Sequence, residues 1–379
     1  MSIYLNRLRR DVHSTTSRIR KACLIAEIGC YYARVGPASE AKLIVQDLRS
    51  EFGAGDSVEV TIWTMLLEGL VLYYEDFDPS ARDRVARAHA LSVGSQIPTL
   101  RALTSAWLAC FDFNACAFVP MITNIRECLL FSTPTDIMAI TRCALLLADI
   151  SLYTGHFDFA ASWYRTVRQL SATNGDQATL GAMIHNRVAF GSARLRLQHS
   201  FGEVDLALVR QIRMEAESCQ SFDALIGTSR LMSLTPIWRS RLILMEGRYV
   251  EASGLFDEYI EIAVAEGHEK MHALLLAESA YCHLNAGELQ VAEKRLFQAS
   301  LVGLSDVDGN LDDSATYFAT LALCNAIMGD QRSCSRNFDY GRGLYERHEV
   351  NVRWLWSIVH DALFNASPEV MALLKASSS

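Results

Sequence analysis

Apolar residues recur at intervals of three and four along most of the chain, with good helix formers between them. The segments CLIAEIGCYYARVG (23–36) and LILMEGRYVEASGLFDEYIEIA (242–263) show this spacing. It gathers apolar side chains on one face of a helix, whereas a half-buried strand alternates with a period of two. No stretch alternates clearly, and most of the seven prolines lie at or near expected turns or helix starts. The pattern predicts an all-α protein.

Eight six-residue stretches share one design: each begins with Gly or Asp and ends, five residues on, with Ala or Cys. They are GPASEA (36–41), DFDPSA (76–81), DFNACA (112–117), GHFDFA (155–160), GEVDLA (202–207), GRYVEA (247–252), GELQVA (287–292) and GDQRSC (329–334). Gly and Asp favour tight turns, because glycine adopts unusual backbone angles and aspartate bonds to nearby backbone groups. Their last residues follow one another at intervals of 36 to 47 residues. Such a period is typical of repeated helical hairpins.

A small residue precedes most of these stretches at a fixed distance. The positions twelve residues before each final Ala or Cys are Gly29, Gly69, Ser105, Ala148, Leu195, Ser240, Ala280 and Ala322. Two antiparallel helices that cross closely need small residues on both sides of the contact. We therefore predict a single right-handed α-solenoid of about eight antiparallel helical hairpins.

The residues Gly29, Tyr32, Gly36 and Ala41, and the segment AEGHEKMHALLLAESAYCHLNAGELQVAE (265–293), carry a family resemblance. The chain resembles the tetratricopeptide (TPR) superfamily over roughly residues 15–350. Its period is longer than the TPR consensus of about 34 residues, and is closest to the helical-repeat sensor region of large LuxR-type regulators. The resemblance implies a superhelix whose first helices line a concave face. Leu195 and the inserted SATNGDQATLGA (171–182) depart from the pattern.

We expect residues 1–350 to form this superhelix, with a lead helix at about 1–20, and residues 351–379 to form a capping helix and polar tail. Trp354, Trp356 and Phe364 are concentrated near the end of the array. A repeat array needs such residues to cover its last apolar face. A self-association patch is the alternative.

Composition and charge narrow the function classes. With 50% hydrophobic and 21% charged residues the chain is typical of soluble folded proteins. The net charge of −8 argues against a nucleic-acid partner, which normally requires a basic face. Arg142 and Asp149 interrupt the most apolar window (137–154), so we expect no membrane span. Ten dispersed cysteines favour a reducing, cytoplasmic location, although the Arg-rich N-terminus leaves organelle targeting or a membrane surface as alternatives.

The segment HEKMH (268–272) has the H-E-x-x-H spacing of zinc hydrolases, with His268 and His272 as ligands. A third ligand is hard to find. Glu278 would face away, and His283, eleven residues on, would lie about 16 Å along a helix. We expect helix-start histidines and no metal, with a zinc-dependent hydrolase as a minority hypothesis.

The acidic stretch SDVDGNLDDS (305–314) resembles a calcium loop but lacks the Gly and Glu that an EF-hand needs at Leu311 and Tyr317. We expect an inter-repeat loop in which Asp313 or Ser314 caps the next helix. The sequence also lacks the nucleophile-elbow, P-loop and dinucleotide-binding motifs. We therefore predict that the protein is not an enzyme and needs no cofactor.

Function is then expected on the concave face, as a non-catalytic scaffold or adaptor that binds a protein or peptide. The alternative is a ligand- or peptide-sensing regulatory module acting on an output partner in trans. A small-molecule effector and homo-oligomerisation are further alternatives. Aromatic and arginine side chains dominate binding hot spots. We expect about half of the candidate lining residues to be packing residues instead. The candidate lining residues are Arg34, Trp63, Tyr73, Tyr74, Arg142, Asp149, Tyr153, Arg196, His199, Arg241, Tyr281 and Asn285.

Overall fold

The described part of the chain is built from helices, which confirms the all-α prediction. A computed structural model describes all residues except 1, 36–37, 54–55, 227–232, 305–309 and 364–379. Within those residues there are seventeen α-helices, one 3-10 helix and no strand. The α-helices are α1 (Ile3–Ser14), α2 (Arg18–Val35), α3 (Ala38–Glu51), α4 (Val58–Asp76), α5 (Ser80–Gly94), α6 (Pro98–Asn114), α7 (Phe118–Phe131), α8 (Ile137–Tyr153), α9 (Phe157–Asn174), α10 (Gln177–Phe201), α11 (Leu206–Ile226), α12 (Leu234–Met245), α13 (Tyr249–Ala265), α14 (His272–Asn285), α15 (Leu289–Val302), α16 (Leu311–Ile327) and α17 (Gln331–Leu363).

Each of the eight repeated stretches begins close to the end of one helix and ends at or near the start of the next. The two helices that flank each stretch pack against each other. At the second stretch the contact is close: a Cβ added at Gly69 of α4 would lie 3.0 Å from the Ala81 carbonyl oxygen of α5. Small residues at both positions therefore allow the approach, as the sequence pattern indicates.

The fifth stretch departs from the pattern because Leu195 belongs to the core. The close approach between α10 and α11 is made one turn earlier, where a Cβ added at Gly191 would lie 3.1 Å from Ile212 Cδ1. The small residue is thus present but shifted by four positions, the spacing that keeps it on the same face of the helix.

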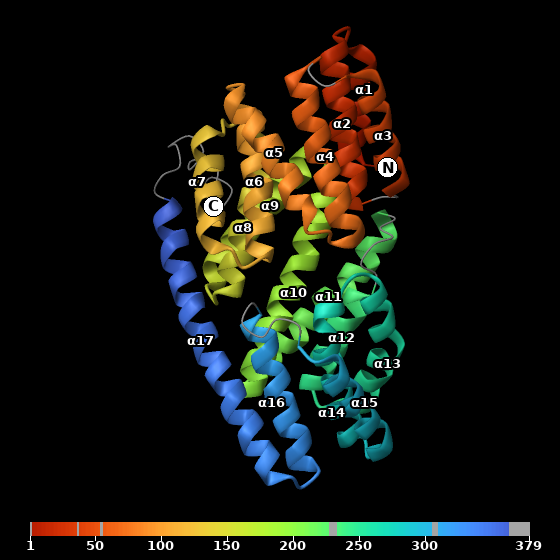
Figure 1. Cartoon of the computed structure of the whole chain (residues 1–379), viewed down its shortest axis with the longest axis vertical. Helices are drawn as coiled ribbons and strands as arrows, with labels where there is room; N and C mark the ends of the chain where they lie inside the picture. The colour runs from red at the N-terminus through yellow and green to blue at the C-terminus, as the bar shows by residue number, and fades with distance from the viewer. Residues whose placement is uncertain (1, 36–37, 54–55, 227–232, 305–309, 364–379) are drawn as a thin grey trace.

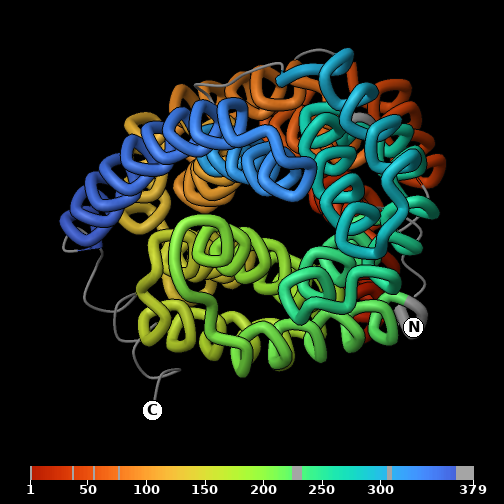
Figure 2. The backbone as a smooth tube through the Cα atoms, turned by 90° about the horizontal axis from the view of Figure 1, so that it is seen from below, coloured from red at the N-terminus to blue at the C-terminus, as the bar shows by residue number. Residues whose placement is uncertain are grey.

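The helices wind around a common axis, and both ends of the array meet its middle (Figures 1 and 2). α10 is 25 residues long and packs against α2, α8, α12 and α16, which lie far apart in sequence. It therefore joins the first half of the chain to the second.

α17 is a continuous helix of 33 residues that runs through position 350, where we expected a separate capping helix to begin. At about 1.5 Å per residue it is some 50 Å long, and it extends back along the molecule to pack on α7 and α8 (Figure 1). Trp356 stacks on His156 with 3.7 Å between ring centroids, and Trp354 lies 6.2 Å from Phe118. These tryptophans contact the middle of the chain rather than cover the end of the array; Phe364 lies outside the described residues.

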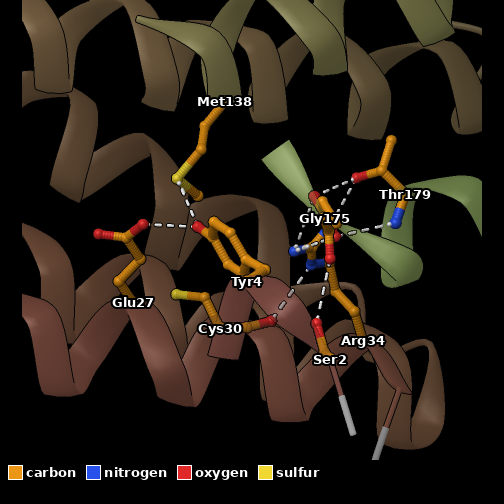
Figure 3. Close-up of polar contacts among 9 residues, drawn as sticks. Ser2, Tyr4, Glu27, Cys30, Arg34, Met138, Gly175 and Thr179 are labelled. Atoms are coloured by element: carbon orange, nitrogen blue, oxygen red, sulfur yellow. Dashed lines mark hydrogen bonds and ion pairs between the residues drawn. The ribbon is translucent and has the colours of Figure 1, made fainter. Parts of the chain in front are cut away.

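The N-terminal helix is tied to the turn between α9 and α10 (Figure 3). It ends at Ser14, short of the expected residue 20. Ser2 Oγ donates a hydrogen bond to the Gly175 carbonyl at 3.1 Å, and the Tyr4 hydroxyl donates one to Glu27 Oε1 at 2.5 Å. Gly175 has a φ of 72°, and a Cβ there would lie 2.7 Å from Ile3 Cβ. Glycine therefore permits both the turn and the docking of α1.

Candidate functional site

A cavity of about 350 Å³ lies on the inner side of α2, α4, α6 and α8, and α10 and α12 line its other side. Its walls are mainly aromatic. Tyr73 contacts Phe111 edge-on at 4.9 Å and Tyr74 at 5.0 Å, and Trp107 lies 6.4 Å from Tyr74. The Tyr73 hydroxyl accepts a hydrogen bond from the Asn114 amide nitrogen at 2.6 Å. Aromatic walls with a few polar groups are typical of ligand sites. We call this space the central cavity.

A stripe of α10 residues forms the opposite wall. Ala178, Gly181, Ala182, His185, Asn186, Ala189 and Phe190 follow one another at helical spacing and all line the central cavity. His185 Nε2 lies 2.8 Å from Asp223 Oδ1 of α11, and its ring meets Trp238 of α12 edge-on at 5.9 Å. The repeat pattern did not indicate this wall, because residues 171–182 depart from it. The available signal was Asp176, whose side chain caps α10 by accepting from the Thr179 backbone N–H.

Asp149 is a buried acid at the bottom of the central cavity, 4% exposed. Its carboxylate accepts hydrogen bonds from the Tyr164 hydroxyl at 2.8 Å and from the Asn186 amide at 2.6 Å. Burial raises the pKa of Asp149 to about 7, although both hydrogen bonds and the nearby Arg142 oppose the shift. This side chain therefore changes charge near neutral pH.

The raised pKa of Asp149 predicts a pH-dependent penalty on folding. The unfolded chain loses this proton near its usual pKa of 3.8, whereas the folded chain keeps it until about pH 7. Stability contributed by this group thus falls as pH rises between those values, and the penalty is full above the folded pKa. We expect the melting temperature of Asp149→Asn, relative to wild type, to be higher at pH 8 than at pH 5. Differential scanning calorimetry of both proteins checks this, and an equal difference at both pH values would contradict it.

Two arginines of the central cavity have different surroundings. Arg34 forms an ion pair with Asp176 at 3.4 Å and donates to Thr179 Oγ1 at 2.9 Å (Figure 3). Arg142 lies over the Trp107 ring at 4.0 Å. No hydrogen bond or ion pair from the described residues reaches its guanidinium, although the residue is only 7% exposed. Arg34 thus connects α2 to α10, whereas Arg142 stays without a polar partner.

The structure brings five of the twelve candidate lining residues together in the central cavity. These five are Arg34, Tyr73, Tyr74, Arg142 and Asp149. Trp63 lines a second cavity of about 730 Å³, beside the N-terminal ends of α4, α6 and α8. Tyr153 packs edge-on against Phe113 at 5.8 Å, as a packing residue does. Asn285 is exposed and bonds to the Tyr281 carbonyl in its own helix.

The other four candidates, Arg196, His199, Arg241 and Tyr281, surround a space of only about 20 Å³. A space of that size holds about one water molecule. Arg196 donates to Asp313 Oδ1 at 2.5 Å, and Arg241 donates to Glu278 Oε2 at 2.8 Å. We call Arg196, Arg241, Glu278 and Asp313 the buried charge cluster. Asp313 pairs across helices, so the expectation that it or Ser314 caps α16 is wrong; the cap position is Asn310.

The H-E-x-x-H segment does not lie on one α-helix. Glu269–Met271 form a 3-10 turn, His268 precedes it, and α14 begins at His272. The His268 ring packs on Phe77 of α4 at 5.2 Å, while His272 Nε2 lies 4.0 Å from Glu261. Among the described residues, no group of three or more His, Cys, Asp or Glu side chains is arranged to hold a metal ion.

Comparisons with known proteins bear on the fold alone. No family model matches the sequence, and no curated protein matches it. Within the described helices none is long and apolar enough to cross a membrane. A solved structure of a Rap protein complexed with competence and sporulation factor is similar, with a TM-score of 0.56 and 10% sequence identity. The match covers 95% of this chain and 99% of that one. The chain therefore has a TPR-like helical-repeat fold.

Proposed function

We propose that this protein is a non-catalytic regulatory module that binds a short peptide in the central cavity. The observation that carries the proposal is the cavity itself: aromatic walls from α4 and α6 face a stripe of α10, with His185 and Asn186 among small and apolar residues, around a space of about 350 Å³. That volume lies in the range of small-ligand sites, about 300–1,000 Å³. The similarly folded Rap protein, solved with a bound factor, supports a ligand-binding role for such an array.

The surroundings of the cavity favour a short segment over a folded protein domain. α10 and α12 face the first helices of the array, so an occupant is contacted from both halves of the chain. Binding would favour the arrangement in which the two halves hold these positions, since a ligand stabilises the state that it binds best. A protein partner that binds this arrangement preferentially would respond to the peptide.

The architecture we propose is a right-handed superhelix of eight hairpins in a cytoplasmic protein.

The alternative is the sensor part of a larger regulator, as the resemblance in repeat length to the LuxR-type sensor region suggests. It uses the same cavity for a small-molecule effector in place of a peptide. Residues 1–350 would form the sensing superhelix in either case. Of the remaining candidate residues, the exposed Asn285 would then face a protein partner rather than the ligand.

Peptide binding is tested with a variant whose larger side chain fills the central cavity. Ala182 is a partly exposed α10 residue that lines it, and we expect Ala182→Trp to abolish peptide binding because the indole occupies the ligand's space. A mixture of short synthetic peptides is passed over immobilised wild-type protein and over the variant, and retained peptides are identified by mass spectrometry.

The matched control is Ala172→Trp, which places the same side chain at an exposed position of α9. We expect peptides retained by wild type and by Ala172→Trp and lost by Ala182→Trp. Peptides retained equally by all three proteins, or by none, would exclude peptide binding in this cavity.

A further inference from the structure

Arg142 differs from the other buried arginines of the described chain in having no acidic partner. The side chain of Arg34 pairs with Asp176, and those of Arg196 and Arg241 pair with Asp313 and Glu278. Arg142 is 7% exposed, and its guanidinium stacks on Trp107 at 4.0 Å without a hydrogen bond or ion pair from the described residues. The fold therefore supplies a counter-charge to three buried guanidinium groups and leaves the fourth without one.

A buried cation without a partner is costly. Arginine keeps its charge at any physiological pH, so it cannot avoid the cost by losing a proton. Removing an ion from water without a compensating charge costs several kcal/mol even after relaxation, by order of magnitude. A structure that holds such a group facing a cavity is suited to an anionic ligand that completes the pair.

Asp149 does not fill this role. The Arg142 charge lowers the pKa of Asp149 less than the hydrogen bonds from Tyr164 and Asn186 do. The two Asp149 oxygens accept from Tyr164 and Asn186, and no ion pair joins them to Arg142. The Trp107 ring holds the guanidinium in place by cation–π stacking, which leaves the N–H groups at its edge for a ligand.

We propose that Arg142 binds a carboxylate of the peptide ligand, with Trp107 as the platform that positions the guanidinium. The inference rests on the proposed use of the central cavity and names the chemistry that the cavity selects. Leu145 and Leu146 also line the cavity, so an apolar side chain beside the carboxylate has a place to pack. Asp149 and Asp223 line the same cavity, so one negative charge on the ligand fits better than a phosphate dianion, because those acids repel further negative charge.

Either the C-terminal carboxylate or an Asp or Glu side chain can supply this group, and the test separates them. Peptides retained by the wild-type protein are synthesised as free acids, as C-terminal amides, and with each Asp or Glu replaced by Asn or Gln. Isothermal titration calorimetry then gives the dissociation constants. We expect one of these replacements to weaken binding to wild type about tenfold or more, the usual effect of losing a hydrogen bond to a charged group.

The carboxylate peptide and the carboxamide form that weakens its binding are then measured with Arg142→Gln, which keeps a polar side chain and removes the charge. This variant should bind the carboxylate and carboxamide forms alike, with the weaker affinity. The matched control, Arg168→Gln, removes an exposed arginine of α9 and should keep the wild-type preference. A preference that survives in Arg142→Gln, or its absence from wild type, would overturn the proposal. If the central cavity does not bind peptides at all, the result is different: Ala182→Trp and wild type then retain peptides equally.

Melting curves without ligand test whether Arg142 has only a structural role. Since no hydrogen bond or ion pair from the described residues holds this group, Arg142→Gln should melt at the wild-type temperature or above. Arg34→Gln, which leaves Asp176 without its ion pair, should melt lower. A clear loss of stability in Arg142→Gln would mean that the arginine serves packing, and would count against the proposal.

Discussion

Replacing Glu278 by glutamine is expected to lower the free energy of unfolding by about 3–5 kcal/mol, the usual cost of removing one partner from a buried ion pair. Glu278 of α14 lies 2.8 Å from Arg241 of α12 and 3.9 Å from Arg196 of α10. These side chains are each 4% exposed. Without the Glu278 charge the two guanidinium groups repel each other inside the protein, and Asp313 is the acid that remains paired with one of them. Urea unfolding followed by circular dichroism measures the loss.

A double variant shows whether the loss comes from the orphaned charge. Glu278→Gln combined with Arg241→Met removes both partners of one pair and leaves Arg196 with Asp313 at 2.5 Å. Because no unpaired charge is left, we expect the double variant to be more stable than Glu278→Gln alone. If the stability loss of the double variant equals the sum of the losses of Glu278→Gln and Arg241→Met measured alone, the cluster does not act as a charge-balanced unit.

A valine at Gly69 is expected to destabilise the protein by about 3 kcal/mol, the upper end of typical overpacking effects. A Cβ at this position would lie 2.5 Å from Val85 Cγ2 and 3.0 Å from the Ala81 carbonyl oxygen. Backbone cannot give way as a flexible side chain can, so α4 and α5 must move apart. Thermal and urea unfolding of the purified variant measure the effect.

Gly254 provides the matched control. It is an exposed glycine within α13, and a Cβ there would meet nothing within 4 Å. Since valine has a slightly higher helix propensity than glycine, we expect Gly254→Val to stay within about 0.5 kcal/mol of wild type. Comparable losses at Gly69 and Gly254 would show that the close helix crossing at Gly69 is not the cause of the loss.

The sequence predicted the helical repeats because their signals are local. A turn needs Gly or Asp within a few residues of the helix end, and a close crossing needs a small residue at a fixed distance from that turn. Gly69 and Ala81 show both, and the structure has a helix ending and another beginning at every one of the eight stretches. The same locality explains the error at Leu195, where the small residue, Gly191, lies one helical turn earlier than the fixed spacing requires.

The candidate site was predictable only in part, because its residues come from helices that lie far apart in the sequence. Arg34 and Tyr73 sit on first helices of hairpins, so the repeat register pointed to them. His185 and Asn186 face the same cavity from α10, a long helix that crosses from one half of the chain to the other. No spacing in the sequence places that helix opposite α4 and α6.

Periodicity and turn chemistry by themselves determined that this chain is all-helical and repetitive, because those properties depend on neighbours within about one hairpin. Tertiary structure alone decided that α17 returns to the middle of the array and that Arg241 finds Glu278. It likewise decided that Arg142 stacks on Trp107 and forms no ion pair with any described residue. Whether a buried charge has a partner depends on how helices far apart in the sequence pack together, and no short stretch of sequence determines that.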